Sequence, residues 1–332
     1  MEKTERTERT ILTGDKDNDA LIKQALRKFQ VPGNQVEFIR HNENLTVKVE
    51  GKYLLRVHKP AASFQTIHPY ANIDVRKMRE EELAFLRHLR QNGMGVQDPV
   101  PDADGGFVAE VDNGIYATML RWIPGRTIGK EELNPQMCQA IGEMTARIRK
   151  AAGGFHAENA LQYDAELCET LKTRFAEDGC GLEEKTRQLL LRTCDCIGER
   201  VAGRRDFMTA HADLSLSNIL ITEQGLVPID FSLFGCAHPM MDIAGLFACV
   251  NGVENRRAIA KGYASLGYGI DFPILDAYFA FSVLLYVVLH IRLCGEESFQ
   301  KNLDRWSRHI FQPLAEGKPL ISEDFYMLHA DA

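Results

Sequence analysis

The sequence predicts an α+β fold in two lobes: a small antiparallel β lobe with one main helix, followed by a larger α-helical lobe. Two observations predict it. Short apolar segments typical of strands lie early in the chain, at residues 35–40, 45–50 and 53–58, whereas amphipathic helical patterns fill most of the remainder. Within the helical part, a short hairpin pattern carries an aspartate, an asparagine and a second aspartate.

The composition is that of an ordinary globular protein. Hydrophobic residues make up 45% of the sequence and charged residues 26%. A length of 332 residues is enough for two lobes with a sizeable core. The net charge of −7 argues against a nucleic-acid partner, which would require a basic face.

Cysteine usage and hydropathy bear on location. The eight cysteines are scattered, with Cys194 and Cys196 the only close pair, which favours reduced thiols in a cytoplasmic protein. The chain begins with charged residues, so we expect no signal peptide. The longest apolar stretch, residues 277–291, is interrupted and too short to span a bilayer, so we expect no membrane partner.

The first lobe opens with a helix. Residues 1–16 are polar and predict a flexible leader. Residues 17–29 carry apolar side chains at helical spacing, with Asp17 or Asn18 as a candidate N-cap. The loop at residues 41–44, between the first two strands, lacks the pattern G-x-G-x-x-G of protein kinases.

A second helix and a hairpin complete this lobe. Residues 75–92 carry leucines along one side and charges on the other, which predicts an amphipathic helix. Residues 107–111 and 115–120 flank a D-N-G turn and predict a hairpin. We therefore expect a first lobe over residues 17–120, for which the resemblance described below implies nucleotide binding.

The second lobe should span residues 121–332 and be mostly helical. Amphipathic or apolar helical patterns occupy residues 134–151, 165–176, 182–201, 240–250, 255–266, 273–293 and 299–314.

The most informative segment is H-A-D-L-S-L-S-N at residues 211–218, followed by P-I-D-F at residues 228–231. A strand, a loop and a hairpin in this order can bring Asp213, Asn218 and Asp230 into one cleft. Kinase-type phosphoryl transfer needs this trio, with one carboxylate on the acceptor hydroxyl and an amide and a second carboxylate on Mg²⁺. The sequence therefore predicts Asp213 as the catalytic residue, and Asn218 and Asp230 as metal ligands. A zinc site is disfavoured, because no second His or Cys cluster lies nearby.

These residues resemble the phosphate-transfer loop of the aminoglycoside phosphotransferase and choline kinase superfamily, whose usual form is H-G-D-x-x-x-x-N and then I-D-F or I-D-W. The resemblance implies a bilobal protein-kinase-like fold, ATP and Mg²⁺ as cofactors, and a small-molecule hydroxyl acceptor. Ala212 stands where glycine is usual, and a positive φ would disfavour alanine there. Asp242 resembles a structural aspartate that braces this loop, and we also expect His211 to brace it.

The resemblance extends to the expected nucleotide site. The segment L-L-R-V resembles the third strand of the family, which implies that Arg56 holds the α- and β-phosphates. It also places Asn44 on the nucleotide-covering loop, and Leu120 and Trp122 at the interlobe hinge, whose backbone binds adenine.

A glutamate from the helix at residues 75–92 should pair with that arginine. Glu80, Glu81 and Glu82 are all candidates. A resemblance of this helix to homoserine kinase type II favours Glu82, and the other two stay open.

The predicted function is phosphate transfer from ATP to an amino alcohol, a homoserine-like compound, a sugar or an aminoglycoside. A Ser/Thr protein kinase and a non-catalytic nucleotide-binding protein are the alternatives. The missing glycine loop counts against the first, and the intact trio counts against the second. Residues 232–234, S-L-F, depart from the D-F-D-D-A expected of a homoserine kinase. Three acidic residues are candidates for binding a cationic acceptor: Asp271, Asp276 and Glu297. The sequence gives no indication of oligomeric state.

Overall fold

The structure is a computed structural model that describes residues 13–61, 73–177 and 181–329. Its compact units are residues 1–66 with 97–124, and residues 67–96 with 125–332. Most of the predicted leader lies outside the described residues. The helix expected at residues 75–92 of the first lobe falls in the second unit. The predicted lobe boundary near Leu120 lies close to the end of the first unit at Pro124. The lobe division stays a prediction.

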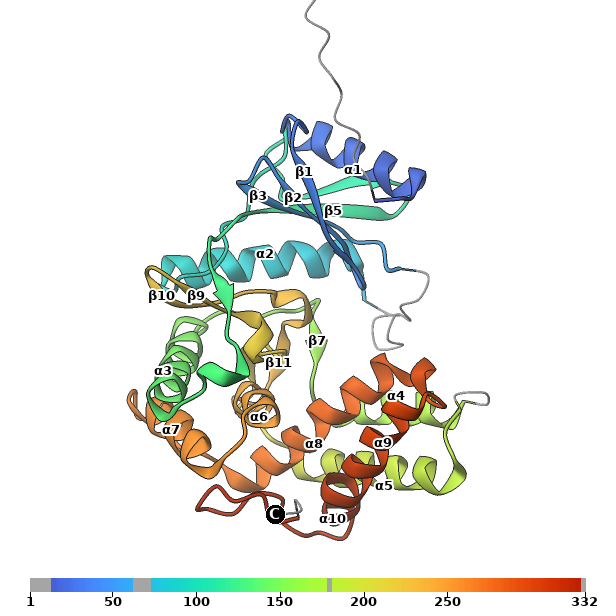
Figure 1. Ribbon diagram of the computed structural model, residues 1–332, viewed down its shortest axis with the longest axis vertical. Coiled ribbons are helices and arrows are strands. Elements are labelled where there is room, and N and C mark those ends of the chain that lie inside the picture. The colour runs from blue at the N-terminus through green and yellow to red at the C-terminus, as the bar shows by residue number, and fades with distance from the viewer. Residues whose placement is uncertain (1–12, 62–72, 178–180, 330–332) are drawn as a thin grey trace, which may run out of the picture. The chain divides into compact units, whose positions relative to one another are not determined.

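The first unit contains a five-stranded antiparallel sheet with the order β1-β2-β3-β5-β4 (Figure 1). The first three strands confirm the strands predicted from the alternating segments, and the hairpin around Gly114 is also present. The strands are β1 (Val36–His41), β2 (Leu45–Val49), β3 (Tyr53–Val57), β4 (Val108–Asp112) and β5 (Ile115–Arg121).

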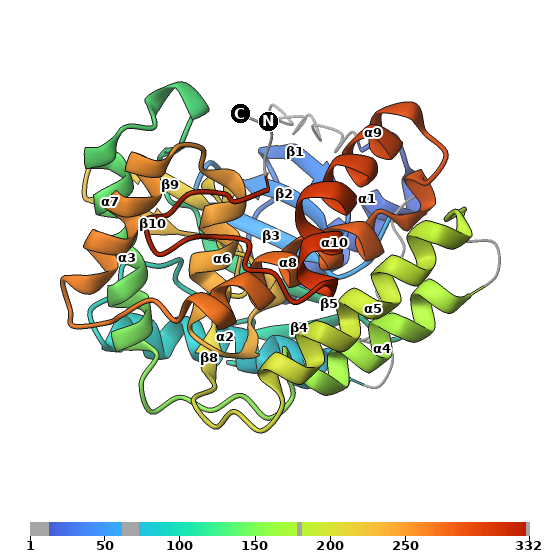
Figure 2. The ribbon, with the colours of Figure 1, turned by 90° about the horizontal axis from the view of Figure 1, so that it is seen from below.

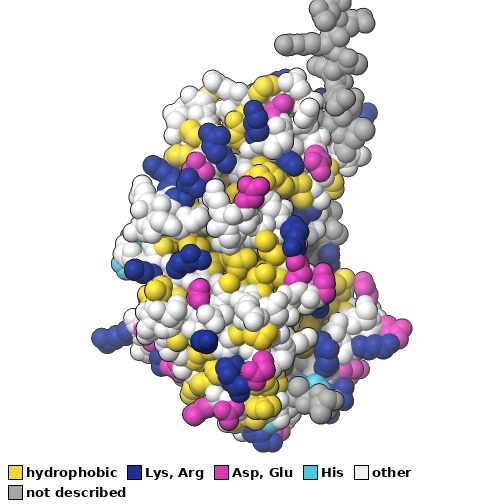
Figure 3. All heavy atoms as spheres, turned by 60° about the vertical axis from the view of Figure 1, so that its left-hand side comes forward, with side chains coloured by type: hydrophobic (Ala, Val, Ile, Leu, Met, Phe, Trp, Pro, Cys, Tyr) yellow, Lys and Arg dark blue, Asp and Glu magenta, His cyan; other side chains and the backbone are white. Residues whose placement is uncertain are grey.

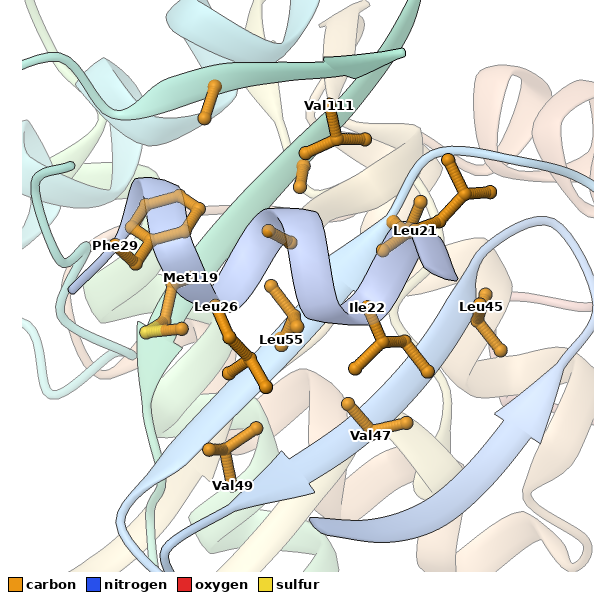
Figure 4. Packing of buried hydrophobic residues seen from close by; sticks show 14 residues of the cluster. Leu21, Ile22, Leu26, Phe29, Leu45, Val47, Val49, Leu55, Val111 and Met119 are labelled. Atoms are coloured by element: carbon orange, nitrogen blue, oxygen red, sulfur yellow. The ribbon is translucent and has the colours of Figure 1, made fainter. Parts of the chain in front are cut away.

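Helix α1 (Lys16–Lys28) lies across one face of this sheet (Figure 4). Leu21, Ile22 and Leu26 pack there against side chains of alternate strand positions, such as Val47 and Leu55. The predicted N-cap was wrong by two or three residues. Asp15 caps the helix, because its carboxylate accepts hydrogen bonds from the backbone N–H groups of residues 17 and 18.

The second unit is largely helical, as predicted. Its longer helices are α2 (Val75–Gln91), α3 (Pro135–Ala151), α4 (Ala165–Ala176), α5 (Glu184–Val201), α6 (Met240–Cys249), α7 (Val253–Ala264), α8 (Phe272–Leu289) and α9 (Glu297–Trp306). Its short strands are β6 (Arg126–Thr127), β7 (Leu161–Gln162), β8 (Met208–Ala210), β9 (Ile219–Thr222), β10 (Gly225–Pro228) and β11 (Gly235–Ala237). Helices α4 and α5 lie side by side, as do α3 and α7 (Figure 2).

Helices α3 and α7 approach each other at backbone distance. A Cβ on Gly142 would lie 2.0 Å from the carbonyl oxygen of Ile259, and a Cβ on Gly262 would lie 2.0 Å from that of Gln139. Both contacts are with backbone, which cannot move aside as a side chain can. Each helix therefore needs a glycine where it crosses the other.

Two helical predictions are corrected. The pattern at residues 299–314 is not one helix, because α9 is followed by a π-helical turn, Ser307–Phe311, and the short helix α10 (Gln312–Ala315). The apolar stretch judged too short for a bilayer belongs to α8, which starts at Phe272 and is long and apolar enough over 18 residues. However, 67% of this helix is buried inside the fold, as in a core helix of a globular protein.

Charged side chains of both signs are interspersed over the face of the molecule shown in Figure 3. This distribution agrees with the modest negative charge of the chain, −7.

Candidate active site

The segment with the predicted trio folds as a loop between two sheet elements. Strand β8 ends at Ala210, the loop carries Asp213, and a 3₁₀ turn, Leu216–Asn218, leads directly into β9. Strands β9 and β10 form the predicted hairpin, and Asp230 follows β10 after one residue.

A buried carboxylate holds the start of this loop. The carboxylate of Asp242, on α6, accepts hydrogen bonds from the backbone N–H groups of Ala212 at 2.8 Å and of His211 at 3.3 Å. Burial raises the pKa of this carboxyl above its ordinary value. These contacts are those expected of a bracing aspartate.

Ala212 adopts a left-handed backbone conformation, with φ of 63°. Glycine reaches this region without steric cost, but alanine does not. Alanine at this position is therefore strained, and the hydrogen bonds that the backbone N–H groups of His211 and Ala212 donate to Asp242 hold it in place.

His211 connects the loop to the strand that precedes Asp230. Its Nε2 lies 2.9 Å from the carbonyl oxygen of Ile229, which can only accept, so Nε2 carries the hydrogen. Its Nδ1 faces the backbone N–H of Asp213 at 3.3 Å and, in this tautomer, accepts. The imidazole ring also lies against Phe231, with 4.3 Å between centroids. A histidine with both ring nitrogens engaged by backbone is a brace, as predicted.

Asn218 and Asp213 are in direct contact. The side-chain NH₂ of Asn218 donates to the backbone carbonyl of Asp213 at 2.8 Å and to its Oδ2 at 2.9 Å. Because the NH₂ group is turned toward Asp213, the amide oxygen of Asn218 faces the other way. The backbone carbonyl of Asn218 accepts from the N–H of Ile229 at 2.9 Å, which places Asp230 next to Asn218 in the fold.

This donor set fits a hard divalent cation. An amide oxygen and a carboxylate are ligands that Mg²⁺ prefers, and phosphate oxygens usually complete its shell. No group of three or more His, Cys, Asp or Glu side chains suited to a metal is found in the part of the chain that the structure describes. A self-sufficient protein site, as for structural zinc, is therefore not present there.

The three glutamates of α2 have different surroundings. Glu80 is paired with Arg76 on the surface. Glu81 accepts two hydrogen bonds from Asn159, both at 2.8 Å. Glu82 is fully buried and accepts from Arg79 at 2.8 Å.

The sequence interpretation missed Arg79. Arg79 is 8% exposed, and its guanidinium donates hydrogen bonds to Glu82 and to the backbone carbonyl of Ser232, two residues after Asp230. The only sequence signal for it is a spacing of three residues from Glu82 on one helix, which puts the two side chains on the same face.

The remaining predicted residues lie in the first unit. Arg56 on β3 is directly opposite Thr46 on β2 and Thr118 on β5. Its neighbours Leu55 and Val57 point into the core under α1, so Arg56 points to the opposite face, as predicted.

Asn44 ends the loop between β1 and β2 and is 9% exposed. Leu120 is buried in β5, opposite Leu54 of β3. Trp122 donates its backbone N–H to the carbonyl of Lys52 at 2.8 Å, and the Lys48 ammonium lies 4.3 Å from its ring centroid.

The acidic candidates for acceptor binding have other partners. Asp271 caps α8 and pairs with Arg204, and Glu297 pairs with Lys301 on α9. Asp276 is 2% exposed and accepts backbone hydrogen bonds from Leu320 at 2.9 Å and Ile321 at 3.0 Å. Their contacts are those of helix caps, surface pairs and chain anchors.

The geometry can be compared with known proteins. The sequence model of the phosphotransferase enzyme family matches residues 35–278 of this chain. The chain belongs to this phosphotransferase family. The predicted resemblance is thereby confirmed, and with it the protein-kinase-like fold class.

Solved structures similar to this phosphotransferase include an amicoumacin kinase in complex with AMP-PNP and Ca²⁺, at a TM-score of 0.71 and 19% identity over 91% of this chain and 94% of that one. A microcompartment-associated aminopropanol kinase has a TM-score of 0.67 and 20% identity over 89% and 97% of the two chains. An aminoglycoside phosphotransferase with GDP and kanamycin has a TM-score of 0.62 and 14% identity over 89% and 98%. At these identities the likeness concerns the fold.

Two curated relatives match over shorter segments. A protein of Deinococcus radiodurans with no described function is 29% identical over 176 residues, 49% of each chain. A homoserine kinase of Allorhizobium ampelinum is 33% identical over 81 residues, 24% of each chain. The phosphotransferase thus matches about half of the first relative and a quarter of the second.

Proposed function

We propose that this phosphotransferase moves the γ-phosphate of ATP to a hydroxyl group of a small molecule. The observation that carries the proposal is the contact of Asn218 with Asp213, next to Asp230, within a chain of this family. The closeness of two carboxylates and an amide supports the arrangement that kinase chemistry uses.

In this proposal Asp213 is the catalytic residue. Its Oδ2 is held by the NH₂ of Asn218, and its backbone N–H is held by His211. A carboxylate fixed in this way can accept a hydrogen bond from the acceptor hydroxyl and align its oxygen with the γ-phosphorus. Little covalent chemistry falls to the protein in phosphoryl transfer, so this positioning is its main contribution.

The amide oxygen of Asn218 and the carboxylate of Asp230 would hold Mg²⁺ on the phosphates. When bound, the ion neutralises charge on the phosphate oxygens. Asn218 would then have two roles, since its NH₂ positions Asp213 while its oxygen faces the metal.

The nucleotide contacts proposed for the first unit are those that the resemblance implies. Arg56 would hold the α- and β-phosphates, Asn44 would lie on the loop that covers the nucleotide, and the backbone at Leu120 and Trp122 would bind adenine. Glu82 would position Arg56. Glu82 is fully buried, which favours it over the exposed Glu80, and it also pairs with Arg79.

The proposed acceptor is an amino alcohol or a related amino-substituted hydroxyl compound. An aminopropanol kinase, an amicoumacin kinase and part of a homoserine kinase are all similar to this chain. We also propose a cytoplasmic location, which the scattered cysteines of the sequence support.

The test is ATP consumption with Mg²⁺ against amino alcohols, homoserine, choline, sugars, aminoglycosides and a generic protein. We expect acceptor-dependent ADP release that disappears in Asp213→Asn while ATP still binds. Glu223→Gln, which alters an exposed carboxylate in the turn of the same hairpin, is the matched control and should leave turnover unchanged. Near wild-type turnover by Asp213→Asn would overturn the mechanism. Phosphorylation of the generic protein, and of none of the small molecules, would indicate a protein kinase. ATP binding without turnover would indicate a nucleotide sensor.

A further inference from the structure

A chain of three polar side chains runs along one face of the sheet in the first unit. Asn44 Oδ1 lies 2.7 Å from Nδ1 of His58, and Nε2 of the same histidine lies 3.0 Å from the Thr118 hydroxyl. His58 directly follows β3 and is two positions from Arg56, so both side chains lie on the face away from α1. These three residues are here called the Asn44 relay.

The chemistry of the relay determines its hydrogen positions. An amide oxygen only accepts, so Nδ1 of His58 must carry a hydrogen and donate it to Asn44. In the neutral imidazole, Nε2 then accepts from the hydroxyl of Thr118. Thr118 is fully buried and lies opposite Arg56 in the sheet, so the last side chain of the relay is held in place.

The relay also determines the direction of the Asn44 amide. With its oxygen turned to His58, the NH₂ group of Asn44 points away from the histidine. Asn44 itself is largely buried, with 9% of its surface exposed. A donor that is already oriented loses little conformational entropy when a ligand oxygen binds to it, which favours affinity.

We propose that His58 is a positioning residue that aims the NH₂ group of Asn44 at a phosphate oxygen of the nucleotide, with the Thr118 hydroxyl holding the other ring nitrogen of His58. The inference rests on the proposed function, because the phosphate is that of ATP. It adds His58 and Thr118, which lie outside the loop at residues 41–44, to the determinants of nucleotide affinity.

The test measures ATP affinity by calorimetry, with folding of each variant checked by thermal unfolding. His58→Phe keeps the ring but not the hydrogen bonds, and we expect the Kd for ATP to rise about tenfold, the equivalent of one lost hydrogen bond to a charged group. His58→Gln retains a donor and should recover part of the loss. Thr118→Val should weaken ATP binding several-fold, whereas Thr118→Ser, the matched control, should not.

A double-mutant cycle of His58 and Asn44 distinguishes a positioning role of His58 from a general effect on the stability of the sheet. If His58 acts through Asn44, His58→Phe should have no further effect in an Asn44→Ala background. Additive losses, or unchanged ATP affinity in His58→Phe, would overturn the inference while leaving the proposed function intact. Absence of ATP binding by the wild-type protein would overturn both.

Discussion

The side-chain NH₂ of Asn218 donates to both the backbone carbonyl and the carboxylate of Asp213, at 2.8 and 2.9 Å. The two residues are five positions apart, and the turn Leu216–Asn218 brings them together. A single amide therefore sets the rotamer of the proposed catalytic carboxylate and turns its own oxygen toward the position proposed for the metal.

Removing this amide should affect both functions at once. In Asn218→Ala we expect kcat to fall about 10–100-fold, as is typical when a group that orients a metal site is lost. The Mg²⁺ concentration at half-maximal rate should rise in the same variant. Steady-state kinetics over a magnesium titration measures both quantities. A change in only one of them would separate the two roles assigned to Asn218.

The buried pair of Arg79 and Glu82 should matter for stability independently of catalysis. Glu82→Gln leaves the guanidinium of Arg79 buried with a weaker partner, so the free energy of unfolding should fall by about 3 kcal/mol. Glu80→Gln, which removes an exposed pair on the same helix, should change it by about 0.5 kcal/mol or less. Urea unfolding of both variants checks this, and equal effects would contradict the role of burial.

The strained alanine of the catalytic loop provides a third prediction. Glycine at position 212 relieves the left-handed strain but adds freedom to the unfolded chain, and the two effects are each about 1 kcal/mol. Ala212→Gly should therefore unfold within a few degrees of the wild type. Ala212→Val should be destabilised by about 2 kcal/mol, because a β-branched residue fits this backbone poorly. Calorimetric unfolding measures the stability of both variants. Equal unfolding temperatures for the two would show that the loop relaxes around position 212 and that the strain is absent.

Asp276 should give the protein a characteristic pH dependence. Burial raises the pKa of this carboxyl to about 6, although the N–H groups of Leu320 and Ile321 oppose the shift. Since the folded state holds this proton more tightly than the unfolded state, the contribution of Asp276 to stability is full below about pH 4 and declines as the pH rises to about 6.

The measurement is the free energy of unfolding from pH 4 to pH 7. In Asp276→Asn the decline due to this group should disappear, a difference of up to roughly 3 kcal/mol across the range at 1.4 kcal/mol per pKa unit. Parallel profiles for variant and wild type would show that the carboxyl titrates normally.

Much of the fold could be predicted because its signals are local. The first three strands, the D-N-G hairpin and the helices of the second unit each carry their periodicity within one segment. Strands β7 and β11 were missed because each is only two or three residues long and their parallel pairing joins residues 161 and 235. Nothing in either segment alone indicates such a partner.

The candidate site divides in the same way. Asp213, Asn218 and Asp230 could be identified because they lie within 18 residues, at a spacing that the chemistry requires. Arg79 and His58 could not, because their partners are far away in sequence. Arg79 meets the carbonyl of Ser232, 153 residues later, and His58 meets Thr118, 60 residues later.

The crossing of α3 and α7 has a consequence for how this protein can diversify. Since backbone meets backbone at Gly142 and at Gly262, the two helices cannot slide or separate without losing both contacts. Sequence changes in a lineage descended from this chain should therefore fall on side chains around the crossing, with the two glycines and the helix pair inherited unchanged. Insertions that shift either helix by one residue should be absent from its functional descendants.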